Sequence, residues 1–255
     1  RYDVYDENIW QKTYLLEDML LSVIQNVTSF ATLYNNSESA NITSFDEFQY
    51  FTGVTSVVGG ASAINSVYRG CFSGLSNLES IKLPDTVTVL SAGAFSNCSS
   101  LKSISIPASL TRGSQQIFVS SGLETIYIEP RTASLDWGNN AFSGCTNLTS
   151  VYISDLNWWT SKQSAQGTGW PFSPNNSEHH LYVNGIEPEN VETSTLLSNC
   201  FKGCYSIKTA NLLEGLTSIP ASAFNRCMGL TTLNTPSTVT SIGQAAFVNC
   251  SSLVT

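Results

Sequence analysis

The sequence predicts an α/β repeat solenoid, in which short parallel strands from successive turns of about 23 residues stack on one another below an N-terminal helical cap. The first observation behind this prediction is that phenylalanine recurs at an almost constant interval, which is broken once, between Phe142 and Phe201. The second is that two apolar residues spaced two apart follow several of these phenylalanines after eight or nine residues, and a proline often comes next. The phenylalanines are Phe48, Phe72, Phe95, Phe118, Phe142, Phe201, Phe224 and Phe247.

Residues 1–41 are expected to form the helical cap and a degenerate first turn. Apolar residues such as Trp10, Tyr14 and Leu20 recur at helical spacing between residues 6 and 25. A solenoid exposes its core at its end, so an atypical segment is needed to cover it. Residues 27–34 weakly echo a later repeat and predict the degenerate turn. No polar linker follows, so we expect one domain, with residues 42–255 forming the solenoid.

Each turn contains a segment of the form Leu-x-x-Ile-x-Ile, as in Leu101, Ile104 and Ile106. Alternation with a period of two predicts a short strand with one buried face, and the following proline ends it by removing a backbone donor. A second apolar pair, such as Val87 and Leu90, leads back to the next phenylalanine. Stacking the turns about 4.8 Å apart would place like residues over like in continuous parallel ladders.

Five of the seven cysteines stand three residues after a phenylalanine, and we expect them to fill a narrow buried position of the core. A disulfide between Cys204 and Cys227, or between Cys227 and Cys250, is an alternative, because neighbouring rungs lie within bonding range. A zinc site is disfavoured because the sequence has no Cys-x-x-Cys. The five cysteines are Cys98, Cys145, Cys204, Cys227 and Cys250.

The long interval between Phe142 and Phe201 contains a segment from about residue 155 to residue 180 that we expect to be an irregular insertion. Three of the five tryptophans, Trp158, Trp159 and Trp170, lie in it. The sequence LYVNG that follows predicts a strand entering a turn at Asn184 and Gly185. Insertions in a solenoid form loops on one face, which is often the binding face.

The repeats AFSNCSSLKSISIP, AFSGCTNLTSVYIS and SIGQAAFVNCSSL resemble the BspA-like leucine-rich repeat family of bacterial surface proteins. ITSFDEFQYFTGVTSV at residues 42–57 and the ends of the insertion, ISDLNWW and HLYVNG, are also similar to segments of such proteins. The resemblance extends over roughly residues 42–255 and implies a right-handed leucine-rich-repeat solenoid. It also implies an extracellular or cell-surface location, with a secretion signal or lipid anchor removed from this sequence.

Composition and motifs argue against several other functions. A net charge of −8 disfavours nucleic acid as a partner, since that binding depends on Lys and Arg. No apolar run reaches the ~18 residues of a membrane span. Glycine-rich phosphate loops and nucleophile motifs are absent, and the only histidines, His179 and His180, are adjacent. We therefore expect neither an enzyme nor a bound cofactor or metal.

The outer face of the predicted sheet is the candidate binding surface. If Ile126 and Val151 point inward, Tyr127 and Tyr152 point outward on adjacent rungs, and the second strand leads directly into the tryptophan-rich segment. Exposed aromatic rings beside hydroxyl groups suit a peptide or a sugar. The alternative is that the tryptophans pack on one another and cover the solenoid. The candidate site residues are Lys82, Lys102, Tyr127, Tyr152, Trp158, Trp159 and Trp170.

Two functions follow from these features. The first is an extracellular, adhesin-like binding module, expected to be a monomer, that recognises a host or matrix protein or a glycan. The second is a spacer segment of a larger surface protein that has no ligand of its own. Clustered aromatic residues near Tyr152 favour the first, whereas the Ser- and Thr-rich face elsewhere favours the second.

Overall fold

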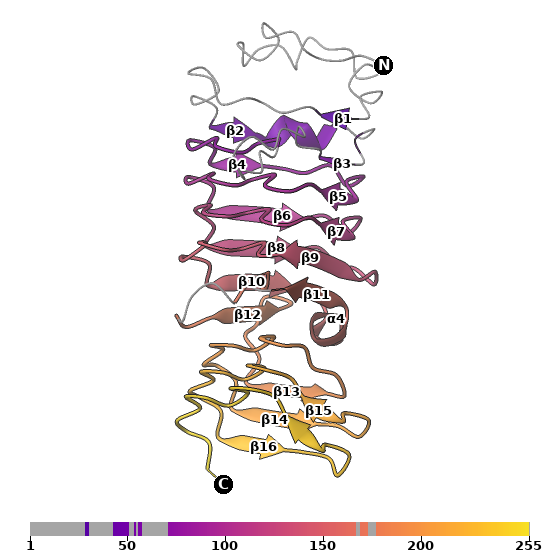
Figure 1. The fold of residues 1–255 in the computed structure, drawn as a ribbon, viewed down its shortest axis with the longest axis vertical. Helices are drawn as coiled ribbons and strands as arrows, with labels where there is room; N and C mark the ends of the chain where they lie inside the picture. The colour runs from indigo at the N-terminus through magenta and orange to yellow at the C-terminus, as the bar shows by residue number, and fades with distance from the viewer. Residues whose placement is uncertain are drawn as a thin grey trace, which may run out of the picture.

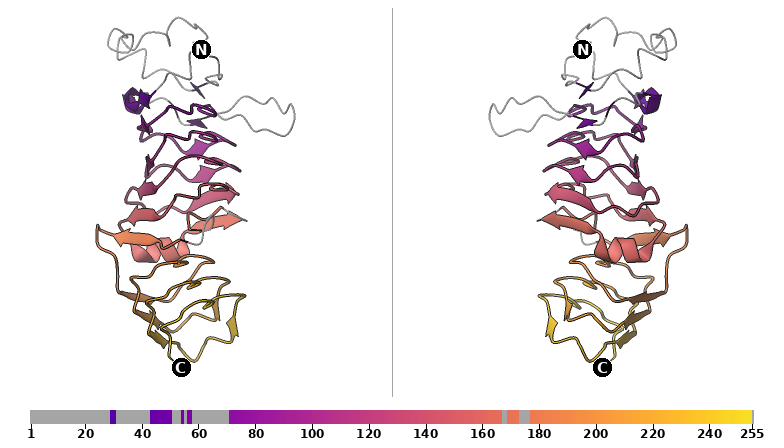
Figure 2. Two further views of the ribbon diagram at one scale, coloured as in Figure 1. Left: turned by 90° about the vertical axis from the view of Figure 1, so that its left-hand side faces the viewer. Right: turned by 90° about the vertical axis from the view of Figure 1, so that its right-hand side faces the viewer.

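The computed structural model describes residues 29–30, 43–50, 54, 56–57, 71–166, 169–172 and 177–254. Over these residues the chain winds as an elongated coil with short strands on two of its sides (Figures 1 and 2). The helix expected between residues 6 and 25 lies outside the described residues. Within the expected degenerate first turn, β1 (Ser29–Phe30) pairs in parallel with β3 (Ser56–Val57).

One side of the coil carries the strands of the Leu-x-x-Ile-x-Ile segments. The principal sheet has the order β12-β10-β8-β6, and a C-terminal sheet has the order β13-β14-β16. The buried positions Ile104, Ile126, Val151 and Leu181 are paired in register, so like residues stack on like as predicted. The strands on this side are β2 (Ser44–Phe45), β4 (Ser80–Ile81), β6 (Ser103–Ile106), β8 (Thr125–Ile128), β10 (Ser150–Ile153), β12 (His180–Val183), β13 (Asn190–Thr193), β14 (Thr209–Leu212) and β16 (Thr232–Asn234).

The second apolar pair of each turn forms the parallel strands on the other side of the coil. The prolines that end the repeat strands also open a turn, because the Pro84 and Pro107 carbonyls accept hydrogen bonds from the N–H groups of Val87 and Leu110, at 3.1 Å each. β2 is followed by the 3-10 helix η2 (Asp46–Tyr50). The strands on this side, with β1 and β3, are β5 (Val89–Leu90), β7 (Arg112–Gly113), β9 (Leu135–Asn139), β11 (Gln163–Gln166), β15 (Ser218–Ile219) and β17 (Ser241–Ile242).

Stacked phenylalanine rings run through the core. Phe72, Phe95, Phe118 and Phe142 follow one another with ring centroids 5.2–5.6 Å apart. A second stack holds Phe201, Phe224 and Phe247 at 5.3 and 5.6 Å. Both stacks place their rings in the offset, near-parallel arrangement that aromatic pairs favour.

The cysteine ladder beside these rings is buried, as expected, with Cys250 at the last turn partly exposed. Most thiols of the ladder donate to the carbonyl of the phenylalanine one turn earlier, for example from Cys145 Sγ to Phe118 O at 2.9 Å and from Cys227 Sγ to Phe201 O at 2.9 Å. All seven cysteines are free, so the disulfide alternatives are wrong. A small apolar side chain that can also donate a weak hydrogen bond suits this position better than alanine or valine.

The chain bends tightly around the phenylalanines from Phe72 onward. The residue two after each of them, and from Phe95 onward also the residue two before, adopts a left-handed backbone. Asn and Gly fill most of these positions, and both tolerate positive φ. Arg226 (φ 61°) and Ala245 (φ 57°) are the residues that tolerate it least. The positions after phenylalanine are Gly74, Asn97, Ser120, Gly144, Gly203, Arg226 and Asn249, and those before it are Gly93, Gln116, Asn140, Asn199, Ser222 and Ala245.

The segment from residue 155 to residue 180, expected to be irregular, contains α4 (Leu156–Ser161) and β11. Asp155 caps the helix, since its Oδ1 accepts a hydrogen bond of 2.8 Å from the Asn157 N–H. Phe172 lies at the middle of the long interval, and Leu181 follows it as Val151 follows Phe142. The described residues of the interruption, 155–166, 169–172 and 177–180, are therefore built into the coil.

The principal and C-terminal sheets are separate, and α4 lies beside β11 near the place where the principal sheet ends (Figure 1). As predicted, β12 enters a turn at Asn184 and Gly185, where φ is 51° and 80°. The Val183 N–H then donates to the Ile186 carbonyl at 2.8 Å, which reverses the chain before β13. From α4, Trp159 Nε1 donates to the Cys200 carbonyl at 2.8 Å and so links the two parts of the coil.

Candidate binding surface on the principal sheet

The outward residues of the principal sheet form two rows that run along the coil. One row holds Ser105, Tyr127, Tyr152 and Tyr182, which the strand register places on successive rungs. Lys82 follows the buried Ile81 as Ser105 follows the buried Ile104, so it continues this row onto the preceding turn. The second row holds Ser103, Thr125, Ser150 and His180.

Three tyrosine rings stack along the first row. The Tyr127 and Tyr152 centroids are 4.8 Å apart, and those of Tyr152 and Tyr182 are 4.3 Å apart with an interplanar angle of 11°. These distances are close to the spacing of neighbouring strands, so the rings lie face to face along the coil axis. The tyrosine ladder, as we call Tyr127, Tyr152 and Tyr182, therefore directs ring edges and hydroxyls outward.

Tyr182 was missed by the sequence prediction, although LYVNG was identified as a strand. The signal that could have found it is the distance from Phe172 to Leu181, which equals the distance from Phe142 to Val151. Burial, the nearby Glu187 carboxylate and the Tyr152 hydroxyl raise the pKa of Tyr182 above its ordinary value. Its phenol therefore stays protonated at neutral pH and can donate a hydrogen bond.

An ion pair and a histidine–carboxylate hydrogen bond flank the tyrosine ladder. Lys102 Nζ lies 3.0 Å from Glu124 Oε1, with about half of each side chain exposed. At the other end of the ladder, His180 Nδ1 lies 2.6 Å from Glu187 Oε1. An exposed ion pair such as the one between Lys102 and Glu124 contributes little to stability. Its effect here is to place charged groups of both signs at one end of the ladder.

The structure corrects the expected place of the three tryptophans. Trp158, Trp159 and Trp170 are 4%, 0% and 5% exposed, so they do not form part of the sheet surface. Trp158 Nε1 donates to the Ala133 carbonyl at 2.8 Å, and the Arg131 guanidinium lies 5.5 Å above its ring. The rings fill the coil where α4 replaces a regular turn, which is the covering role that the sequence left as the alternative.

Two shallow hollows lie away from the tyrosine ladder. One, of about 270 Å³, lies between α4 and the C-terminal part and is lined by hydroxyl and apolar side chains, with no titratable group. The other, of about 480 Å³, contains Arg131, whose guanidinium donates to the carbonyls of Pro107, Ala108 and Leu110. Neither brings together an acid and a base or a nucleophile and a base.

Over the described part of the chain, no group of three or more His, Cys, Asp or Glu side chains is arranged to hold a metal ion. In the same residues, no helix has the length and apolar character needed to cross a membrane. The buried cysteines offer no activated nucleophile, since burial raises the pKa of Cys98 to about 12 and that of Cys145 to about 11.

Comparison with known proteins identifies the repeat. Residues 65–164 and 184–255 match six copies of the BspA type leucine rich repeat region. The chain belongs to the BspA-type leucine-rich repeat family. No curated protein matches this BspA-type chain in sequence.

Several solved structures are similar to this BspA-type chain. A leucine-rich repeat protein from Bacteroides ovatus shares 20% identity over 90% of this chain and 74% of its own, with a TM-score of 0.28. A leucine-rich repeat protein from Eubacterium ventriosum shares 18% identity over 90% of this chain and 63% of its own, with a TM-score of 0.43. A leucine rich cell surface protein from Faecalibacterium prausnitzii shares 23% identity over 83% of this chain and 61% of its own, with a TM-score of 0.38.

Proposed function

We propose that this BspA-type domain is a non-enzymatic binding module at the bacterial cell surface or outside the cell, and that it recognises a host or matrix protein or a glycan. The observation that carries the proposal is the tyrosine ladder, whose rings are stacked on adjacent strands of the principal sheet. Membership of the BspA-type family supports the surface location.

The ladder suits recognition because its side chains are already ordered. Each tyrosine stands on a strand that is hydrogen-bonded to a neighbouring turn, and each ring packs against the next. Tyrosine has few rotatable bonds, so little conformational entropy remains to be lost when a ligand binds. Its hydroxyl and its apolar ring edge can contact both polar and apolar parts of a ligand.

The charged residues of the same surface add a means of selection. Lys102 is paired with Glu124, and Lys82 is exposed on the neighbouring turn of the same face. The long-range field of the protein is negative, but it is screened beyond roughly 8 Å at physiological salt. Local pairs and single lysines therefore decide which charged groups of a ligand are accepted.

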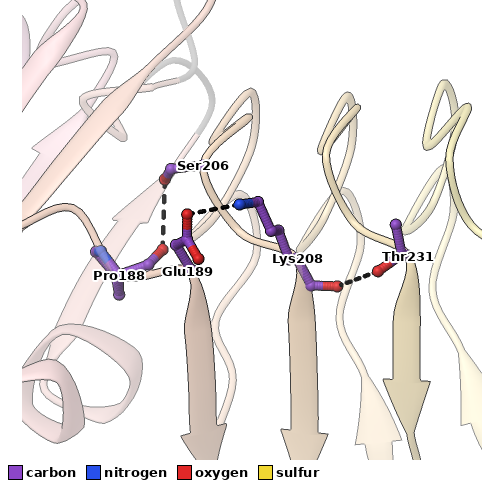
Figure 3. Close-up of polar contacts among 5 residues, drawn as sticks. All are labelled: Pro188, Glu189, Ser206, Lys208 and Thr231. Atoms are coloured by element: carbon purple, nitrogen blue, oxygen red, sulfur yellow. Dashed lines mark hydrogen bonds and ion pairs between the residues drawn. The ribbon is translucent and has the colours of Figure 1, made fainter.

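A spacer role is the second candidate, and the C-terminal sheet favours it for that part of the coil. Asn234 Nδ2 donates to Asn211 Oδ1 at 2.6 Å. Lys208 Nζ lies 2.6 Å from Glu189 Oε1, and the Lys208 carbonyl accepts from Thr231 Oγ1 at 3.1 Å. Both contacts are drawn in Figure 3. These polar groups hydrogen-bond to one another across the turns. The C-terminal sheet therefore offers a ligand fewer free hydrogen-bonding groups than the tyrosine ladder does.

The test is a binding screen of the purified chain on arrays of matrix proteins and glycans. A variant with Tyr127, Tyr152 and Tyr182 all changed to Ser removes the ladder but keeps residues that this face already carries. A matched control changes Glu192, Asn211 and Asn234 to Ser on the C-terminal sheet. Binding that the first variant loses and the control keeps would support the module, and a folded intact chain that binds nothing would favour the spacer.

A further inference from the structure

The tyrosine ladder ends abruptly at Tyr127. Tyr152 is covered by a ring on both sides, whereas the neighbour of Tyr127 on the β6 side is Ser105. Tyr127 is 42% exposed, more than either of the other two rings. One face of its ring therefore borders an open place on the next rung, which we call the Tyr127 slot.

The Tyr127 slot is bounded by three kinds of groups. Tyr127 forms one wall, Ser105 and Ser103 form the floor, and Lys82 stands on the rung beyond. With strands about 4.8 Å apart, Tyr127 and Lys82 are separated by two rungs, or roughly 10 Å between their backbones. The slot thus has the width of one missing ring between an aromatic face and an ammonium group.

We infer that the Tyr127 slot binds an acidic pyranose unit of a glycan, with the sugar ring stacked on Tyr127 and its carboxylate beside Lys82. This inference rests on the proposed binding function and names the ligand class for the same surface. A sugar ring seated over Ser105 would take the place of a fourth ring in the ladder. It would lie at a spacing from Tyr127 similar to the 4.3–4.8 Å within the stack.

The floor of the slot supplies hydrogen bonds that a sugar can use. Ser103 is exposed and Ser105 is half-buried, and neither hydroxyl has a hydrogen-bond partner among the described residues. A hydroxyl both donates and accepts, which matches the hydroxyls of a pyranose. Ser105 is also small enough to leave the space that a tyrosine fills on the next three rungs.

Charge complementarity favours an acidic unit over a neutral one. Lys82 makes no ion pair with any described residue. Asp46, on the rung beyond it, directs Oδ2 to the hydroxyls of Ser44 and Ser80, at 3.1 and 2.9 Å. The Lys82 ammonium is therefore an unpaired positive charge at the slot. An acidic pyranose satisfies the ring face and this charge within a single unit.

The experiment measures binding of the purified chain to uronic-acid oligosaccharides, namely hyaluronan, chondroitin and oligogalacturonate hexamers, and to the carboxyl-reduced form of each. We expect at least one acidic hexamer to bind and its reduced form to bind at least about tenfold more weakly. Lys82→Gln should abolish this preference. Ser105→Tyr should abolish binding, because it fills the slot with a fourth ring of a kind that the neighbouring rungs already hold.

Two further variants make the test specific. Tyr127→Leu removes the aromatic wall and should abolish binding even if Ser105→Tyr proves unstable. Asn211→Ser, on the outward face of the C-terminal sheet, is the matched control and should change affinity less than about twofold. Circular dichroism of each variant shows that it is folded.

The inference is overturned if no acidic hexamer binds, if acidic and reduced forms bind equally, or if folded Ser105→Tyr binds as well as the unaltered chain. The proposed function has a separate outcome. If acidic glycans fail but a matrix protein or neutral glycan binds and is lost in the triple Ser variant, the binding module stands and only the ligand class is wrong. A peptide ligand that places its own aromatic ring in the slot would give this result, in which the matrix protein binds and the acidic glycans do not.

Discussion

His179 gives the sharpest prediction about stability, because it is a histidine held neutral inside the coil. It is 1% exposed and stacks on Phe172 with ring centroids 4.6 Å apart. Its Nδ1 lies 2.6 Å from the Lys202 carbonyl, so this nitrogen carries the proton and donates. Burial, with Lys202 and Arg226 nearby, lowers the pKa of His179 from 6.5 to about 4.

The shift makes stability depend on pH in a definite direction. A base whose pKa is lower in the folded chain than in the unfolded chain binds fewer protons when folded. The contribution of neutral His179 to the free energy of unfolding is therefore fully present above pH 6.5 and is lost as the pH falls toward 4. A shift from 6.5 to about 4 corresponds to on the order of 3 kcal/mol in full. About 2.5 kcal/mol of this would be lost by pH 4.5.

The assay is urea unfolding followed by far-ultraviolet circular dichroism at pH 7 and pH 4.5, for the unaltered chain and His179→Gln. Both chains have the same carboxylates, so the difference between their unfolding free energies isolates the imidazole. We expect the free energy of unfolding of the unaltered chain, relative to that of His179→Gln, to fall by about 2 to 3 kcal/mol from pH 7 to pH 4.5. An equal fall in both chains would refute the claim that His179 is held neutral.

Three further predictions concern other parts of the coil. Ala245→Gly should raise stability by about 1 kcal/mol in a thermal or urea unfolding experiment, since glycine relieves the positive φ; a loss of stability would contradict that account. Trp159→Ala should cost about 3 to 5 kcal/mol, because it removes a fully buried ring and the bond to the Cys200 carbonyl; a cost below about 1 kcal/mol would show that α4 does not hold the two parts together. A thiol reagent should label Cys250 first in the native chain, and mass spectrometry showing Cys98 labelled as fast would rule out the buried ladder.

The regular part of the fold could be predicted from the sequence because the period fixes which residues share a rung. Once Leu101 and Leu123 are aligned, Ile104 and Ile126 must stack, and Ser105 and Tyr127 after them must face outward. The same argument placed Tyr127 and Tyr152 side by side. The contact of 4.8 Å between their rings confirms that register.

The interruption could not be predicted because its contacts join residues far apart in the sequence. Trp159 is anchored by the carbonyl of Cys200, well beyond the end of its own turn, and no local pattern reveals that partner. With the period lost, nothing in the sequence showed whether a tryptophan faced the core or the solvent. The hydrogen bonds from the cysteine thiols to phenylalanine carbonyls were hidden for a different reason, since they depend on backbone geometry.

The most direct test of the central claim is the dissociation constant of the strongest ligand from the array, measured for three chains. They are the unaltered chain, the variant with the tyrosine ladder changed to Ser, and the control changed on the C-terminal sheet. A binding module centred on the ladder predicts at least about a hundredfold weaker binding for the ladder variant and less than about a twofold change for the control. Equal affinity of all three chains would contradict the account.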